Sequence, residues 1–299
     1  MRTSLECIPC FIRQALDAAK MITSDEKILI SAMKKVMAAM AAFDLSLTPP
    51  EAGQIIHRII RAEVNDSDPY IKLKRLSTRR ATELGERVKN SIYASGNSFE
   101  TAVKFSIAGN IMDFGMKSEW DESHIMSSFK KAETEPVDSK TIQRLYDEIK
   151  NAKNVLVLGD NAGETVFDRL LIETFPGNAR VFYGVKGSPV INDAVAEDAI
   201  EAGINSVAEI LPNGTDSSGT LLHKCTPEFI EQFNAADVVI AKGQGNFETL
   251  NNAARKIYFL FQVKCAVIAD FYNFKNGEWI VADSNEFLKN INGRLNNDN

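Results

Sequence analysis

The chain has 299 residues, a length that suits about two domains. Hydrophobic residues make up 44%, charged residues 25% and aromatic residues 8%, which are globular proportions and exclude a disordered, collagenous or coiled-coil protein. The formal net charge is −6. No apolar run reaches the roughly 18 residues of a membrane span, because Gln262 and Lys264 interrupt the best candidate, 257–269.

The N-terminal segment predicts a cytoplasmic protein, because Glu6 and Arg13 fall where a signal peptide needs an unbroken apolar region. Four cysteines are too few for a disulfide scaffold, and we expect them to stay reduced. They are Cys7, Cys10, Cys225 and Cys265.

The charge is unevenly distributed along the chain. Residues 1–150 carry 22 Lys and Arg against 21 Asp and Glu, a balance of +1, whereas residues 151–299 carry 12 against 19, a balance of −7. The acidic second half argues against nucleic-acid binding there and is compatible with a divalent cation.

The first part of the chain predicts a helical bundle. From Phe11 to about Tyr93 apolar residues recur at helical spacing, without the alternation of strands. Pro49 and Pro50 mark the start of one helix. The polar stretch 117–139 lacks sustained periodicity and is the predicted connection between domains. We therefore expect a helical domain over 1–136 and a second domain over 137–299.

The second part alternates short β-rich runs with helical patterns, which predicts parallel strands at 154–159, 180–185, 207–211, 237–241 and 264–269. The run 155–158 is apolar without alternation, as expected when helices cover both faces of the sheet. The predicted fold class is therefore α/β, with a three-layer α/β/α domain built on a mostly parallel sheet.

Ligands of such a sheet bind beyond the carboxyl ends of its strands. Asp160 and Asn161 follow the first predicted strand, and their oxygens suit a hard cation such as Mg²⁺ or Mn²⁺. The alternative is that Asp160 caps the next helix and Glu164 complements the helix dipole. Asp193, after the second strand, is either a third ligand or an ordinary N-terminal carboxylate.

The segment 242–248 follows the fourth predicted strand and combines Lys242 with two glycines at a strand-to-helix turn. Backbone N–H groups, helix dipole and ammonium can together face an anion such as phosphate. The alternative is an ordinary turn. Metal-binding oxygens opposite a phosphate binder predict phosphate-ester hydrolysis by metal-activated water, and the alternative there is phosphometabolite binding without turnover.

Other chemistries have weaker support. The sequence has no Gly-x-Ser-x-Gly elbow and no His-Glu-x-x-His motif, and His57 lies in the apolar stretch 55–60, which predicts a structural role. Cys7 and Cys10 can bind a soft metal or cycle between redox states, but no second cysteine pair completes a tetrahedral site.

Several separated motifs occur in a specific order along the chain. They are Cys7-x-x-Cys10, Asp68-Pro69-Tyr70 with Lys74, the segments 109–115 and 159–164, Asn192-Asp193, and the segment 242–248. Together they resemble the metal-dependent damage-control phosphatases, formerly a domain of unknown function, and in particular the prokaryotic subfamily with an N-terminal cysteine pair.

The resemblance implies a helical N-terminal domain on a three-layer α/β domain. It also implies a hydrolase that uses a divalent cation (Mn²⁺, Mg²⁺, Ni²⁺ or Co²⁺) to act on small phosphorylated metabolites such as sugar or nucleotide phosphates in metabolite damage control. A membrane or nucleic-acid partner is not expected. Because a related eukaryotic branch has been proposed to methylate protein carboxylates, an S-adenosylmethionine-dependent carboxyl methyltransferase is the remaining alternative.

Mapping the family's site onto this sequence gives each motif a role. Asp160, Asn161 and Asp193 are expected to hold the metal, and Lys242 to bind the phosphate. The resemblance places the remaining expected pocket residues around them; they are Glu164, Asn110, Asp113, Gly243 and Asn246.

Overall fold

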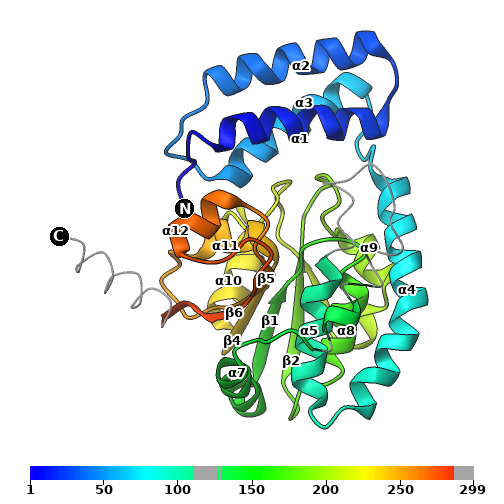
Figure 1. Cartoon of the computed structure of the whole chain (residues 1–299), viewed down its shortest axis with the longest axis vertical. Helices are drawn as coiled ribbons and strands as arrows, with labels where there is room; N and C mark the ends of the chain where they lie inside the picture. Colours follow the sequence, from blue (N-terminus) through cyan, green and yellow to red (C-terminus); the bar gives the residue numbers. More distant parts are fainter. Residues whose placement is uncertain (111–126, 128, 133, 286–299) are drawn as a thin grey trace, which may run out of the picture.

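A computed structural model describes residues 1–110, 127, 129–132 and 134–285. Its elements form a helical bundle standing over a mostly parallel sheet that is covered by helices on both faces (Figure 1). Asp113, expected at the pocket, lies outside the described residues. No helix within those residues is long and apolar enough to cross a membrane.

The bundle consists of α1 (Cys7–Ile22), α2 (Glu26–Ala41) and α3 (Pro49–Val64). Helix α3 begins at Pro49, as predicted, and the carboxylate of Glu51 accepts a hydrogen bond from the Thr48 N–H at 2.9 Å, which satisfies a donor at the helix start. Phe11, Val36 and Ile56 belong to one buried apolar cluster that joins the three helices. The bundle therefore has a small core of its own.

Helices α4 (Ile71–Ala94) and α5 (Ser98–Gly109) belong to a different core. Val88 of α4 and Phe99 of α5 share an apolar cluster with Val155 and Val238 of the sheet. In Figure 1 both helices run down beside the sheet rather than within the bundle. The division of the chain at residue 136 stays a prediction, and the two helices that precede it share their core with the sheet.

The sheet has six strands in the order β3-β2-β1-β4-β5-β6. The strands are β1 (Asn154–Leu158), β2 (Arg180–Val185), β3 (Glu209–Pro212), β4 (Val238–Lys242), β5 (Tyr258–Gln262) and β6 (Trp279–Asp283). Neighbours pair in parallel except β5 and β6, which are antiparallel. The strand order reverses between β1 and β4, and this switch point is where open α/β sheets bind ligands.

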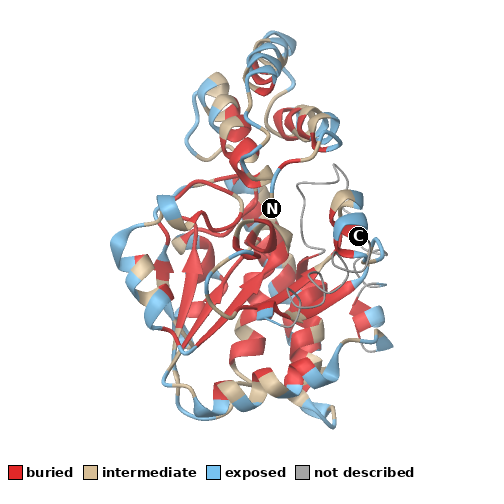
Figure 2. Cartoon of the chain, turned by 90° about the vertical axis from the view of Figure 1, so that its left-hand side faces the viewer, coloured by how far each residue is buried: buried red, intermediate tan, exposed pale blue. Residues whose placement is uncertain are grey.

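Helices cover both faces of the sheet, and their bounds are α7 (Ser139–Asn151), α8 (Thr165–Ile172), α9 (Ala196–Glu201), α10 (Pro227–Ala235), α11 (Gly243–Leu250) and α12 (Ala266–Tyr272). Val155 and Val157 of β1 join the cluster on one face, whereas Leu156 and Leu158 join the cluster on the other. The strands are buried throughout much of their length, as Figure 2 shows. The predicted α/β class is therefore confirmed.

The fifth strand was wrongly predicted at 264–269. The strand lies earlier, at Tyr258–Gln262, and Ala266–Tyr272 forms α12. The apolar run 257–269 spans both elements, and a short run of this kind has no periodicity that separates a strand from a buried helix. The antiparallel edge strand β6 was not predicted, and β3 begins two residues later than the predicted run at 207.

Candidate active site

A cavity of about 430 Å³ lies between the bundle and the carboxyl edge of the sheet. Residues from the sheet edge that line it include Asp160, Asn161, Asp193, Ser218, Gln244, Glu248 and Lys264. The bundle contributes, among others, Cys7, Phe11, Pro50, Gly53 and His57, and Asn110 follows α5. The cavity thus has one strongly polar side and one side built from the helices.

The three predicted metal ligands come together at this cavity. Asn161 and Asp193 form an isolated antiparallel bridge, which places the loop after β2 beside the loop after β1. The backbone carbonyl of Asp160 accepts a hydrogen bond from the Ala194 N–H at 2.8 Å, which fixes the same two loops. Residues separated by more than thirty positions in sequence therefore present two carboxylates and an amide to one space.

Asparagine amides hold the carboxylates of this cluster in place. Nδ2 of Asn110 donates to Oδ2 of Asp160 at 2.9 Å and to Oε2 of Glu164 at 2.6 Å. Nδ2 of Asn161 donates to the same two oxygens at 3.2 and 3.3 Å. Because its nitrogen is committed to carboxylates, the group that Asn161 offers to a cation is its carbonyl oxygen Oδ1.

Glu164 is fully buried and does not line the cavity. Burial raises the pKa of its carboxyl to about 7, an effect that the Lys242 ammonium opposes. Its oxygens accept hydrogen bonds from Asn110 and Asn161 on one side and from Lys242 on the other. Glu164 therefore supports the residues that face the cavity, and its predicted role in binding substrate stays a prediction.

Lys242 lies behind the site rather than in it. Its ammonium is completely buried and donates to Oδ1 of Asp168 at 2.7 Å, to the carbonyl of Ser106 at 3.1 Å and to Oε1 of Glu164. Lys242 is not among the residues that line the cavity. Its ammonium is paired with the buried carboxylates of Glu164 and Asp168, and the contact with phosphate predicted for this lysine stays a prediction.

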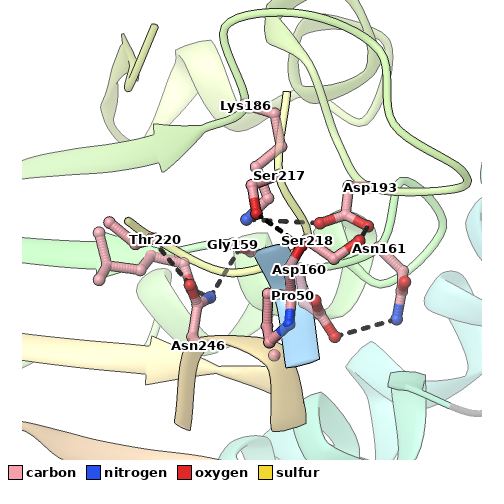
Figure 3. Close-up of polar contacts among 12 residues, drawn as sticks. Pro50, Gly159, Asp160, Asn161, Lys186, Asp193, Ser217, Ser218, Thr220 and Asn246 are labelled. Atoms are coloured by element: carbon pink, nitrogen blue, oxygen red, sulfur yellow. Dashed lines mark hydrogen bonds and ion pairs between the residues drawn. The ribbon is translucent and has the colours of Figure 1, made fainter. Parts of the chain in front are cut away.

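Gly243 and Asn246 also act from behind the cavity wall. Asn246 is fully buried, and its Nδ2 donates to the carbonyls of Lys242 at 2.7 Å and Gly159 at 3.2 Å, while its Oδ1 accepts from Thr220 at 2.8 Å (Figure 3). Gly243 has a φ of +77°. Both residues help to hold the turns after β1 and β4 together, and their predicted role in binding substrate stays a prediction.

Lys264 is a cavity residue that the sequence reasoning missed. It follows β5, and its Nζ donates to the carbonyl of Asn110 at 3.3 Å. Gln244 fixes its backbone by accepting from the Lys264 N–H at 3.0 Å. Among the described lining residues Lys264 is the one lysine or arginine. Lys264 was missed because the fifth strand was predicted at the wrong place. A strand that begins at residue 264 would put this lysine at the opposite edge of the sheet.

Asp193 has two partners beside the cavity. Oγ of Ser218 donates to its Oδ1 at 3.2 Å, and Nζ of the buried Lys186 lies 3.4 Å from its Oδ2 (Figure 3). Across the cavity, Glu248 accepts from Nε2 of Gln244 at 2.8 Å. Burial raises the pKa of Glu248 to about 7. The polar side of the cavity therefore contains more carboxylates than cations.

Cys7 and Cys10 line the cavity together with Cys265. Burial raises the pKa of the Cys7 and Cys10 thiols, so both are protonated at neutral pH. Within the described residues, no three His, Cys, Asp or Glu side chains form a group that could hold a metal ion. The soft-metal role of the cysteine pair stays a prediction, as does the hard-cation site, whose predicted ligands are the amide of Asn161 and the two carboxylates beside it.

The protein has a doubly wound α/β sheet, and acidic and amide oxygens lie at the switch point of this sheet under a helical bundle. This arrangement defines an α/β protein whose candidate site lies at the carboxyl edge of the sheet. Residues 3–280 match the family described as damage-control phosphatase ARMT1-like domain. The chain belongs to this family, and the membership supports a phosphatase function. Its assignment to the cysteine-pair subfamily depends on Cys7 and Cys10 alone and stays a prediction.

Similar proteins span nearly the whole chain. "Damage-control phosphatase PH1575" of Pyrococcus horikoshii is 35% identical over 90% of this chain and 93% of its own. A "Damage-control phosphatase" of Archaeoglobus fulgidus is 30% identical over 90% of this chain and 94% of its own. The crystal structure of a DUF89 family protein from Pyrococcus horikoshii has a TM-score of 0.86, with 33% identity over 95% of this chain and 99% of that chain.

Proposed function

We propose that this protein is a divalent-metal-dependent phosphatase of small phosphorylated metabolites, with Asp160, Asn161 and Asp193 as the metal ligands. The observation that carries the proposal is the bridge between Asn161 and Asp193, which brings three oxygen-bearing side chains to a cavity with Lys264 on its wall. The names of the relatives support phosphatase chemistry.

The donor set fits a hard cation. Two carboxylates and one carbonyl oxygen are typical ligands of Mg²⁺ and Mn²⁺, whereas a soft metal would require thiolates or imidazoles. The Nδ2 atoms of Asn110 and Asn161 already donate to Asp160, which orients the carboxylate before any ion arrives. A bound cation would polarise a phosphoryl oxygen and lower the pKa of a water beside it.

The chain's own residues supply the other requirements of phosphate-ester hydrolysis. Lys264 can bind phosphoryl oxygens from the cavity wall, where its ammonium lies beside Asn110. Lys242, Glu164 and Asn110 hold that cluster rigid from below, because each is buried and hydrogen-bonded. The cavity of about 430 Å³ suits a small metabolite such as a sugar or nucleotide phosphate.

The proposal is tested on the full chain with an aryl phosphate and a panel of sugar and nucleotide phosphates. Activity should require Mg²⁺, Mn²⁺, Ni²⁺ or Co²⁺ and disappear with a chelator. Asp160→Ala and Asp193→Asn should lower kcat by about a hundredfold or more and weaken Mn²⁺ binding measured by equilibrium dialysis. Asp147→Asn, an exposed change on α7, is the matched control.

The alternatives give different results. Chelator-resistant activity would overturn the metal-dependent mechanism. Tight binding of a phosphorylated compound without release of inorganic phosphate would identify a binding protein instead. Saturable binding of S-adenosylmethionine without phosphatase activity would favour the methyltransferase.

A further inference from the structure

The side chains of helix α3 contact three different parts of the protein. Ile56 and Ile60 lie in the core of the bundle. Arg58 and Arg61 reach Asp216 on the loop after β3, at 2.6 Å in each case. A third set lines the cavity; it includes Pro50 and, at a spacing of four residues, Pro49, Gly53 and His57. The anchoring to Asp216 fixes which face of the helix the cavity meets.

Gly53 leaves open space on that face. It lies inside α3 without a positive φ, and a Cβ atom placed on it would meet nothing within 4 Å. Neither backbone geometry nor packing therefore requires glycine here. A glycine inside a helix costs about 0.5–1 kcal/mol relative to alanine. Glycine at position 53 therefore makes the helix less stable than alanine would. The absence of a side chain at this position also makes the cavity wider.

His57 presents a hydrogen-bond donor one turn further along. Its Nδ1 lies 2.9 Å from the hydroxyl of Tyr70, and that hydroxyl has no other hydrogen-bond partner among the described residues. The phenol therefore donates to Nδ1, which places the imidazole proton on Nε2. Burial, aided by Arg61, lowers the pKa of His57 to about 4, so the ring is neutral at physiological pH.

Nε2 of His57 is free to face a ligand. The side chain is only 5% exposed, lines the cavity, and makes no hydrogen bond through Nε2 to any described residue. An N–H at the wall of the cavity can donate to an oxygen acceptor of an occupant. The contact with Tyr70 agrees with the structural role that the sequence predicted for His57, and its place on the cavity wall adds a second possible role.

We propose that Gly53 and His57 form the subsite for the organic part of the substrate, an inference that rests on the proposed phosphatase function. Gly53 provides the room, and Nε2–H of His57 donates to a hydroxyl or ring oxygen of the ester. With the phosphate near Lys264 and the acidic cluster, the organic part extends toward α3. The preferred class is therefore an oxygen-rich phosphomonoester such as a sugar phosphate.

The first test fills the space above Gly53. Gly53→Leu should lower kcat/KM for a hexose phosphate at least tenfold more than for glycerol 3-phosphate, which is short enough to remain below the new side chain. Gly53→Ala should keep or raise the Tm, because alanine favours the helix. Gly96→Leu is the matched control, since a Cβ there also meets nothing within 4 Å and the residue is exposed.

The second test removes the donor of His57. His57→Phe should raise KM for the hexose phosphate about tenfold with little change in kcat, whereas His57→Gln, which keeps an N–H donor, should restore part of the affinity. Wild type should prefer the hexose phosphate over deoxy analogues, and the phenylalanine variant should lose preference at one hydroxyl. Across pH 6–8 the KM of the wild type should show no step from this histidine.

The outcomes separate this inference from the proposed function. If wild type hydrolyses both esters but Gly53→Leu affects them equally and His57→Phe keeps the deoxy discrimination, the subsite is overturned and the phosphatase function stands. If wild type with metal hydrolyses no phosphomonoester, the proposed function is overturned and the subsite with it.

Discussion

Gly243 approaches Asp160 so closely that a Cβ atom on the glycine would lie 1.9 Å from Oδ2 of the aspartate. The turn after β4 therefore fits against the carboxylate after β1 only without a side chain. The positive φ of +77° at Gly243 adds a second requirement for glycine. The segment predicted to bind phosphate thus shapes the position of a predicted metal ligand.

Gly243→Ala should consequently displace Asp160. We expect kcat/KM to fall by about a hundredfold and the free energy of unfolding to fall by about 1–3 kcal/mol, because an L residue at this φ is strained. Steady-state kinetics and urea unfolding measure the two effects. Gly96→Ala, at an exposed and open position, should change neither. Normal activity in Gly243→Ala would contradict the tight fit at Asp160.

Removing Lys242 should mainly lower the stability of the protein, whereas removing Lys264 should mainly weaken the binding of substrate. Lys242→Met leaves Glu164 and Asp168 buried without their cation and should lower the free energy of unfolding by about 3–5 kcal/mol. Lys264→Met should change stability little and raise KM for phosphate esters about tenfold or more, because this ammonium lies at the cavity. Thermal unfolding and kinetics of both variants provide the comparison. The opposite pattern would restore Lys242 as the phosphate ligand.

Asp216 should anchor α3 in a pH-dependent way. Its carboxylate accepts from Arg58, Arg61 and Gln54, and these hydrogen bonds hold its pKa well below the usual range despite partial burial. A depressed folded-state pKa contributes stability above about pH 4 that is lost as the pH falls through the folded value. Asp216→Asn should cost about 1–3 kcal/mol at pH 7.

The difference between wild type and Asp216→Asn should shrink below pH 4, which thermal unfolding from pH 7 down to pH 2.5 would reveal. Asp147→Asn is the control for loss of an exposed charge. A constant difference across this range would show that the charge of Asp216 does not anchor the helix.

The contribution of Glu248 to stability should change with pH in the opposite direction to that of Asp216. Burial raises the pKa of its carboxyl to about 7, and the negative charge of Asp160 acts in the same direction, whereas Gln244 and the chain's amino terminus oppose it. A raised folded-state pKa means that stability falls as pH rises from about 4 to 7 and is constant above that. Glu248→Gln should therefore gain on the order of 2–3 kcal/mol relative to wild type over this range.

Chemical unfolding at pH 5, 6, 7 and 8 measures that gain. Glu228→Gln, an exposed change on α10, should show none. A pH-independent difference between wild type and Glu248→Gln would mean that Glu248 does not titrate between pH 5 and 8, which would contradict the raised pKa.

Local pattern determined much of the architecture. The run 155–158 is apolar at every position, and a strand with this pattern needs a core on both faces, which is what β1 has. A parallel sheet in turn places the residues after its strands along one edge, so Asp160, Asn161 and Asp193 could be grouped from sequence before their contact was seen. The apolar pattern of a strand and the direction of the chain are both local properties of the sequence. They are therefore sufficient to predict the buried strand and the edge at which these residues meet.

The tertiary structure alone decided which long side chains reach the cavity. Lys242 and Lys264 both follow strands, but the turn after β4 points the first toward Glu164 and Asp168, whereas the second emerges beside Asn110. Likewise, the ion pairs of Arg58 and Arg61 with Asp216 hold α3 in the orientation in which His57 lines the cavity. Such choices depend on contacts between residues far apart in the chain, and neither composition nor spacing encodes which distant partner covers a given ammonium or imidazole.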